Sequence, residues 1–227
     1  MFQEILNAPL RILTLGARQH ALINRSMMKE IRAAFEAGDW TCHVCGVRIP
    51  GLMEVDHIKG HNLSGKAALA PICQFCHDLK HPLWAASRGR FVPVAAPGFD
   101  QASITRFSWT LLSEGLRKDS FLDVDDVREA LDEREDAAWE ILGGDNIESA
   151  FEALYTIRDR RGEDKAQKVA RALDASLRFV PSDVKDLSSP SRWTREGFRQ
   201  ASSDVLHDGM GSLPDRDALF RAAREVA

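Results

Sequence analysis

Residues 42–81, CHVCGVRIPGLMEVDHIKGHNLSGKAALAPICQFCHDLKH, hold all four cysteines of the 227-residue chain and five of its seven histidines. The cysteines form two Cys-x-x-Cys pairs, Cys42/Cys45 and Cys73/Cys76. One such pair presents two thiolates to one ion, and two pairs complete the tetrahedral shell that Zn²⁺ prefers. Because all four positions are cysteine, no coordination position is left open for a substrate. The spacing therefore predicts a structural zinc site.

The composition favours a protein of a reducing compartment. The first ten residues include Glu4, Asn7 and Pro9 and do not have the pattern of a signal peptide. No apolar run approaches the ~18 residues that a membrane span requires. In a reducing compartment, paired Cys-x-x-Cys motifs indicate a metal site rather than disulfides. We therefore expect a cytoplasmic protein without a membrane span.

The charge is distributed unevenly along the chain. Residues 1–97 carry 11 Lys and Arg against 7 Asp and Glu, whereas residues 98–227 carry 19 against 27. The net charge of −4 argues against a protein whose whole surface binds nucleic acid. The basic excess also lacks the interleaved aromatic residues of nucleic-acid platforms. A zinc-scaffolded DNA-binding module is therefore the weakest of three functions that the sequence allows.

The pattern predicts an α+β fold, mostly α, in two parts: a zinc module with an N-terminal helix and a linker in residues 1–97, and an acidic helical region in residues 98–227. The two cysteine pairs and the elements between them should give the order β, β, α around one metal. The first part should contain a strand at 11–15, a helix from about Gln19 to Gly38, strands at 47–49 and 53–58, a helix through Lys80 and, at 82–99, a linker or an extended wrapping segment. The second should contain helices near 100–112, 123–141, 147–157, 166–177, 193–205 and 219–223, with Asp100 and Asp123 as N-caps and Gly143 as a stop.

The cysteine segment also carries Asp56-His57 and, directly after the fourth cysteine, His77. This arrangement resembles the HNH family of ββα-metal nucleases, so we expect a small HNH-like ββα zinc module. The resemblance implies that His57 is the general base that activates water. It also implies that Asp56 and His77 hold Mg²⁺ or Mn²⁺ against the scissile phosphate.

One position departs from the HNH pattern, because Ala68 stands where the family has asparagine. Asn62 could replace that amide only if the intervening loop folds back. In a structural alternative, Asp56 and His57 anchor the strand and His77 supports the zinc ligands. We therefore expect an inactive or repurposed site, and keep an HNH endonuclease as the alternative.

A wider resemblance covers most of the chain. It rests on the entry Phe35-x4-Trp40-Thr41-Cys42, on the segment PGFDQASITRF at 97–107 and on LRFVPS at 177–182. These segments resemble the IcmJ/DotN family, which belongs to the coupling complex of type IVB (Dot/Icm) secretion systems.

The resemblance to this family implies a non-catalytic, zinc-stabilised subunit docked on a DotL-like coupling ATPase. Its other implied partners are DotM-like and IcmS/IcmW-like subunits, and its implied task is to help recruit or hand over effectors. The location implied is cytoplasmic, at the inner face of the membrane through the complex.

A partner peptide would need an apolar anchor, since exposed ion pairs contribute only ~0 to 1 kcal/mol each. Trp84 and Phe91, with Phe75 as a wall, are candidate anchors because no helical stripe requires them. The alternative is that these aromatic residues cover the back of the ββα core.

Overall fold

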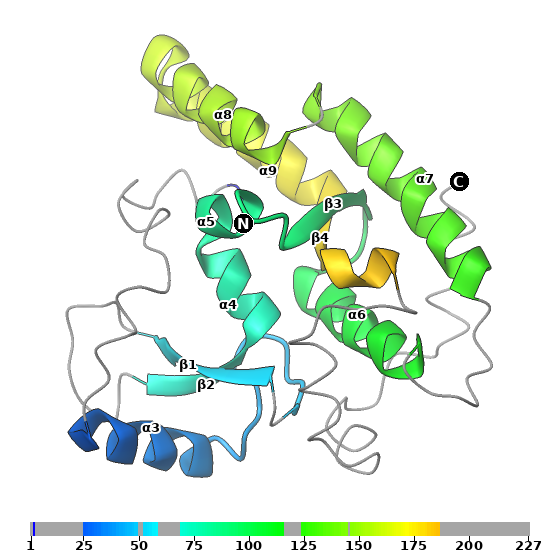
Figure 1. Cartoon of the computed structure of the whole chain (residues 1–227). Helices are drawn as coiled ribbons and strands as arrows, with labels where there is room; N and C mark the ends of the chain where they lie inside the picture. Colours follow the sequence, from blue (N-terminus) through cyan, green and yellow to red (C-terminus); the bar gives the residue numbers. More distant parts are fainter. Residues whose placement is uncertain are drawn as a thin grey trace.

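A computed structural model describes residues 2, 25–49, 52–58, 69–115, 124–144 and 146–186 (Figure 1). The fold is α+β and mostly helical, with two short two-stranded sheets, which confirms the predicted fold class. The strand predicted at 11–15 and the helices predicted at 193–205 and 219–223 lie outside the described residues. No helix in the described part of the chain is both long and apolar enough to cross a bilayer.

The described part of the chain contains short strands and helices of different lengths. The strands are β1 (Met53–His57), β2 (Leu69–Cys73), β3 (Phe91–Ala95) and β4 (Leu177–Pro181). The helices are α3 (Arg25–Ala37), α4 (Gln74–Lys80), α5 (Pro82–Ala86), α6 (Gln101–Gly115), α7 (Val124–Leu142), α8 (Ile147–Arg161), α9 (Glu163–Ser176) and the 3₁₀ turn η4 (Ser182–Lys185).

Three helix ends lie where the sequence predicts them. α3 ends before Gly38, where a Cβ atom would lie 2.7 Å from the Pro71 side chain, so glycine lets α3 approach β2 closely. Asp100 caps α6, since its Oδ1 accepts a hydrogen bond from the Ser103 N–H at 2.6 Å. α7 ends at Gly143, which adopts a left-handed φ of 73°.

β1 and β2 form an antiparallel pair in which Met53 lies opposite Cys73. The prediction of a strand at 53–58 is confirmed, but the strand predicted at 47–49 is wrong, because β1 pairs with residues 69–73 instead. The Val47 carbonyl accepts a hydrogen bond from the Cys42 N–H at 2.9 Å and so closes the first cysteine turn. The predicted order β, β, α is therefore kept, but the two strands are β1 and β2 rather than the segments 47–49 and 53–58.

β3 and β4 form a second antiparallel pair although they are far apart in the sequence, with Phe91 opposite Pro181. The prediction for 82–99 is a linker or an extended wrapping segment; the linker is wrong, because this segment contains α5 and β3, and its extended part is the strand β3. Pro82 is the first residue of α5, a position where the missing N–H of proline is tolerated. The second sheet joins residues on both sides of position 97, and the division into 1–97 and 98–227 stays a prediction.

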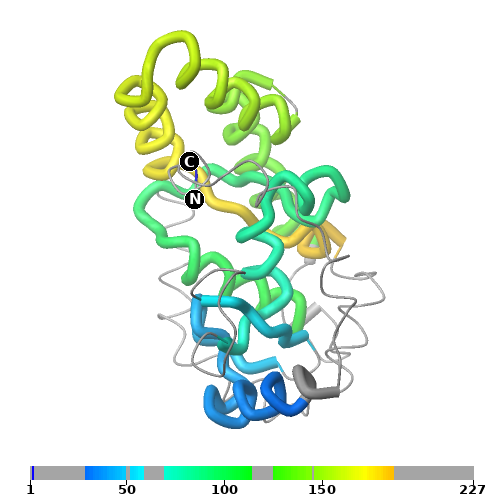
Figure 2. The backbone as a smooth tube through the Cα atoms, turned by 90° about the vertical axis from the view of Figure 1, so that its left-hand side faces the viewer, coloured from blue at the N-terminus to red at the C-terminus, as the bar shows by residue number. Residues whose placement is uncertain are grey.

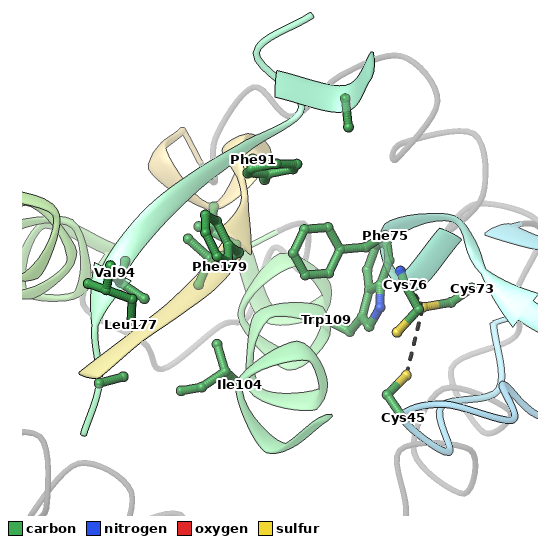
Figure 3. Packing of buried hydrophobic residues seen from close by; sticks show 14 of the residues in the cluster. Cys45, Cys73, Phe75, Cys76, Phe91, Val94, Ile104, Trp109, Leu177 and Phe179 are labelled. Carbon is green, nitrogen blue, oxygen red and sulfur yellow. Dashed lines mark hydrogen bonds between the residues drawn. The ribbon is translucent and has the colours of Figure 1, made fainter. Parts of the chain in front are cut away.

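The two sheets belong to one elongated molecule. In Figure 2, α3, β1 and β2 lie at one end and the helical pair α8–α9 at the other. A single cluster of buried apolar residues runs from the cysteines through α6 to β4 (Figure 3). Phe75 and Phe91 are 2% and 4% exposed in this cluster, so their prediction as partner anchors is wrong and the core-covering alternative applies to them. Trp84 is half-buried, with the Arg88 guanidinium 4.6 Å above its ring.

Candidate metal centre

Two turns of similar geometry present the four cysteines. In the first turn, the Cys45 N–H lies 3.5 Å from the Cys42 sulfur and donates to it. In the second, the Cys76 N–H donates to the Cys73 sulfur at 3.4 Å, and this sulfur also caps α4. Gly46 closes the first turn with a left-handed φ of 79°. Backbone N–H groups that point at sulfur stabilise the thiolate form.

The four sulfurs converge as the spacing predicts. The sulfurs of Cys42, Cys45, Cys73 and Cys76 lie within 4.8 Å of one another, and all four residues are buried. The Cys45 and Cys73 sulfurs are 3.7 Å apart (Figure 3), much farther than the ~2.05 Å of a disulfide. With metal–sulfur bonds of ~2.3 Å, sulfurs at the corners of a tetrahedron lie about 3.8 Å apart. The donor set therefore fits a tetrahedral metal ion that binds thiolates.

The environment of the cysteines explains why a cation would hold them together. Burial raises the pKa of the Cys73 thiol, and hydrogen bonding to Cys42 and Cys45 raises the pKa of Cys76. The pKa of Cys42 is lowered because the other cysteines, Cys45 first, donate hydrogen bonds to its thiolate. Without a metal ion, the thiolate form is thus favoured at Cys42 and disfavoured at Cys73 and Cys76. A bound metal ion supplies the positive charge that stabilises all four thiolates.

Arg106 of α6 contacts the first cysteine turn from outside the cysteine segment. The Arg106 guanidinium donates to the Cys45 carbonyl at 2.9 Å. A divalent ion with four thiolates carries a net charge of −2, so this half-buried cation lies on the side of the centre where it offsets that charge. Arg106 was not predicted from the sequence, because it lies 61 residues beyond Cys45.

Asp56, the predicted ligand of a second metal, is held by two basic side chains. Asp56 is 4% exposed, and its Oδ2 lies 2.8 Å from His43 Nε2 and 2.5 Å from Lys80 Nζ. Burial by itself raises the pKa of Asp56, but Lys80 and then His43 outweigh it and bring that pKa below its usual value. The carboxylate is therefore ionised and already bound by the Lys80 ammonium group and the His43 ring of its own chain.

His77, the other predicted ligand of that metal, has a carboxylate partner. Its Nδ1 lies 2.5 Å from Glu54 Oε2, and its ring meets His81 edge-on at 5.2 Å. Glu54 and Asp56 are two positions apart on β1 and thus share the face that carries these contacts to α4. The same alternation places His57 on the opposite face of the strand. Glu54 was missed, although its period-two spacing from Asp56 is a signal for it.

The structure thus brings the four cysteines together and gives Asp56 and His77 separate partners. Among the described residues, only the four cysteines bring three or more ligand atoms within 4.8 Å of one another. The catalytic roles of Asp56, His57 and His77 stay predictions, and Ala68 and Asn62 lie outside the described residues. No family model matches this chain, and no curated protein matches it.

Proposed function

We propose that this chain is a non-catalytic, zinc-stabilised subunit that binds other proteins. Zn²⁺ is the ion that the cysteines favour, because it is commonly held by four thiolates in closed tetrahedral sites. Cys42, Cys45, Cys73 and Cys76 would hold it, and the bound ion would contribute folding energy to the β1–β2–α4 unit. A closed shell gives the ion no position for a substrate.

The contact between Lys80 and Asp56 carries the non-catalytic part of the proposal. A catalytic divalent ion at Asp56 would have to displace the Lys80 ammonium group, which lies 2.5 Å from the carboxylate oxygen. Lys80 is exposed but the Asp56 carboxylate is buried, so the ion would have to compete with an ammonium group that already neutralises this carboxylate. The pair is explained more simply as a structural ion pair between β1 and α4. His43, in the first cysteine turn, is hydrogen-bonded to the same carboxylate.

The class of partner follows from the resemblance of the chain to the IcmJ/DotN family. On this basis we propose a DotL-like coupling ATPase as the direct partner, with DotM-like and IcmS/IcmW-like subunits in the same type IVB complex. Its location would be cytoplasmic, at the inner membrane face, and its role the recruitment or transfer of effectors.

One contact favours a second candidate, an HNH endonuclease with His57 as general base and Mg²⁺ or Mn²⁺ as cofactor. The pairing of Glu54 with His77 Nδ1 is the arrangement that orients a metal-ligating histidine in many metal sites. In that function the zinc would remain structural, and Asp56 with His77 would bind the catalytic ion.

Plasmid cleavage with Mg²⁺ or Mn²⁺, in the purified full chain and its His57→Ala variant, separates the two functions. We expect no cleavage above the background that His57→Ala shows. Cleavage by the wild-type chain that the variant loses would establish the nuclease and refute the non-catalytic subunit.

A pull-down with the tail of the coupling ATPase tests the partner. The full chain should retain the tail in high salt, since an apolar anchor resists screening. Loss of zinc in Cys73→Ser should abolish retention if the zinc-bound fold carries the docking surface. Failure of the wild-type chain to retain the tail would refute this choice of partner.

A further inference from the structure

A groove lies between α6, α7 and β3, on the side of the molecule away from the cysteines. It is open to solvent, has a cavity volume of about 70 Å³, and nine of its ten lining residues are apolar. Phe99, Ile104 and Phe107 line it from the start of α6, and Val127 and Leu131 line it from α7.

The polar groups of the groove do not suit a small-molecule ligand. Sites for small molecules place several polar groups so that they converge on the ligand. Among the ten lining residues, Arg134 is the only one with a polar side chain, and its guanidinium donates to the Ala95 carbonyl at 2.9 Å. The lining is better matched to apolar side chains presented by a protein segment.

The charge on α7 indicates which kind of protein segment would bind in the groove. α7 carries eight acidic residues and two arginines, a net charge of −6. Ala130 lines the groove and is exposed, and at helical spacing its neighbours on the outer side are Asp126 and Glu133, both exposed. On α6, the residues flanking Phe107 on its outer side are Ser103 and Thr110, which are neutral. The rim of the groove is therefore negative along α7, whereas on α6 it is formed by neutral residues, with the Arg106 guanidinium donating to the Ser103 hydroxyl oxygen at 3.0 Å.

We propose that this groove binds a basic amphipathic helix of a partner protein. The apolar face of such a helix would fill the groove, and its lysines or arginines would lie along the outer face of α7. The acidic rim gives charge complementarity, and the apolar floor gives the anchor that exposed ion pairs lack. This inference rests on the proposed function as a protein-binding subunit, and it adds the chemistry of the bound segment.

The test uses a labelled synthetic helix of about 18 residues, with leucines at helical spacing and lysines elsewhere, and fluorescence anisotropy with the full chain. A peptide with glutamate in place of every lysine is its charge control. The main variant is Ala130→Arg, which adds bulk and positive charge at an exposed position and so leaves the fold intact. Ala153→Arg on α8 is the matched control, because Ala153 is also an exposed alanine within a helix.

We expect the lysine peptide to bind the wild-type chain and Ala153→Arg equally, and Ala130→Arg about tenfold or more weakly. Asp126→Asn with Glu133→Gln should weaken binding a few-fold and reduce its salt dependence. Equal binding of both peptides, or no effect of Ala130→Arg, would overturn the proposal.

A last variant, Trp193→Ser with Phe198→Ser in the full chain, tests the chain's own C-terminal segment as the occupant. Peptide binding that occurs only in this variant would overturn the partner proposal and assign the groove to residues 187–227. If the ATPase tail is retained equally by the wild-type chain and by Ala130→Arg, the protein-binding function stands, but the tail binds at another surface. The two failures are thereby distinguishable.

Discussion

The part of the chain that the structure describes contains two small antiparallel sheets with five residue pairs each, and they are stabilised in different ways. β1–β2 ends at Cys73, beside four converging sulfurs, and its face toward α4 carries Glu54 and Asp56 in polar contacts. β3–β4 has Phe91, Val94, Phe179 and Val180 buried among helices. An isolated two-stranded sheet is marginally stable at best, so each needs outside support. The first depends on polar and metal-binding groups, and the second on apolar burial.

The two sheets are also joined. Arg106 on α6 donates to the Cys45 carbonyl at 2.9 Å, and Arg90, just before β3, donates to Asp78 on α4 at 3.0 Å. Phe75 and Trp109 lie near one another in the shared core (Figure 3). The comparison therefore yields a testable distinction: metal loss should act first on β1–β2, and core truncation first on β3–β4.

Removal of the metal should produce the largest effect. We expect Cys73→Ser to bind no zinc and to lose the β1–β2–α4 unit, because structural zinc sites contribute on the order of 10–16 kcal/mol of binding free energy. Elemental analysis and hydrogen exchange of residues 42–49 and 69–80 measure both results. Val44→Ser, an exposed position within the first cysteine turn, is the control and should keep zinc. A zinc-free Cys73→Ser protein with the melting curve of the wild type would contradict the claim that β1–β2 depends on the metal ion.

Truncation of the second core should produce the next largest effect. Phe179 is 1% exposed and packs against Phe2 at 5.8 Å and Phe91 at 5.0 Å. Phe179→Ala should lower the free energy of unfolding by about 3–5 kcal/mol, measured by urea denaturation. The folded fraction should still bind one zinc per chain, and Ile141→Ala at an exposed position should change little. Loss of zinc together with stability would show that the two sheets fold as one unit.

The metal site could be predicted from the sequence because its signal is local. Two Cys-x-x-Cys turns need only short-range geometry, and their convergence follows from the tetrahedral coordination that the ion prefers. The helix ends at Gly38, Asp100 and Gly143 are local signals of the same kind. The partners of Asp56 and His77 required the register of β1 against α4, which the sequence does not specify.

The strands were harder to predict because their pairing is not local. β2 contains Pro71 and lacks the alternation of polar and apolar residues that marks a strand. β3 contains Pro93 and pairs with residues 177–181. The prolines of the 82–99 segment, Pro82, Pro93 and Pro97, predict a linker or an extended wrapping segment instead. Pairing with β4 and packing against α7 account for the extended form of β3.

The smallest effect concerns Asp100, the N-cap of α6, which is the helix that contacts both regions. Asp100 Oδ1 accepts the Ser103 N–H at 2.6 Å and Oδ2 accepts the Ser103 hydroxyl at 3.0 Å. The backbone hydrogen bond from Ser103, acting against partial burial, brings the pKa of Asp100 below its usual value. Asp100→Ala should therefore lower the free energy of unfolding by about 1 kcal/mol at pH 7, with zinc content unchanged.

The pH dependence of this cap separates its charge from its hydrogen bonds. Because the pKa of Asp100 is lower in the folded chain than in the unfolded one, its charge stabilises the fold above the unfolded value and stops doing so as pH falls through the folded value. The stability difference between wild type and Asp100→Ala should therefore shrink between pH 7 and roughly pH 3. Asp100→Asn keeps a capping oxygen without a titrating group, so its difference from Asp100→Ala should stay constant. Urea denaturation of the three proteins at each pH cancels any common loss of metal in acid. If the stability difference between the wild type and Asp100→Ala does not change with pH, the hydrogen bonds alone stabilise the start of α6.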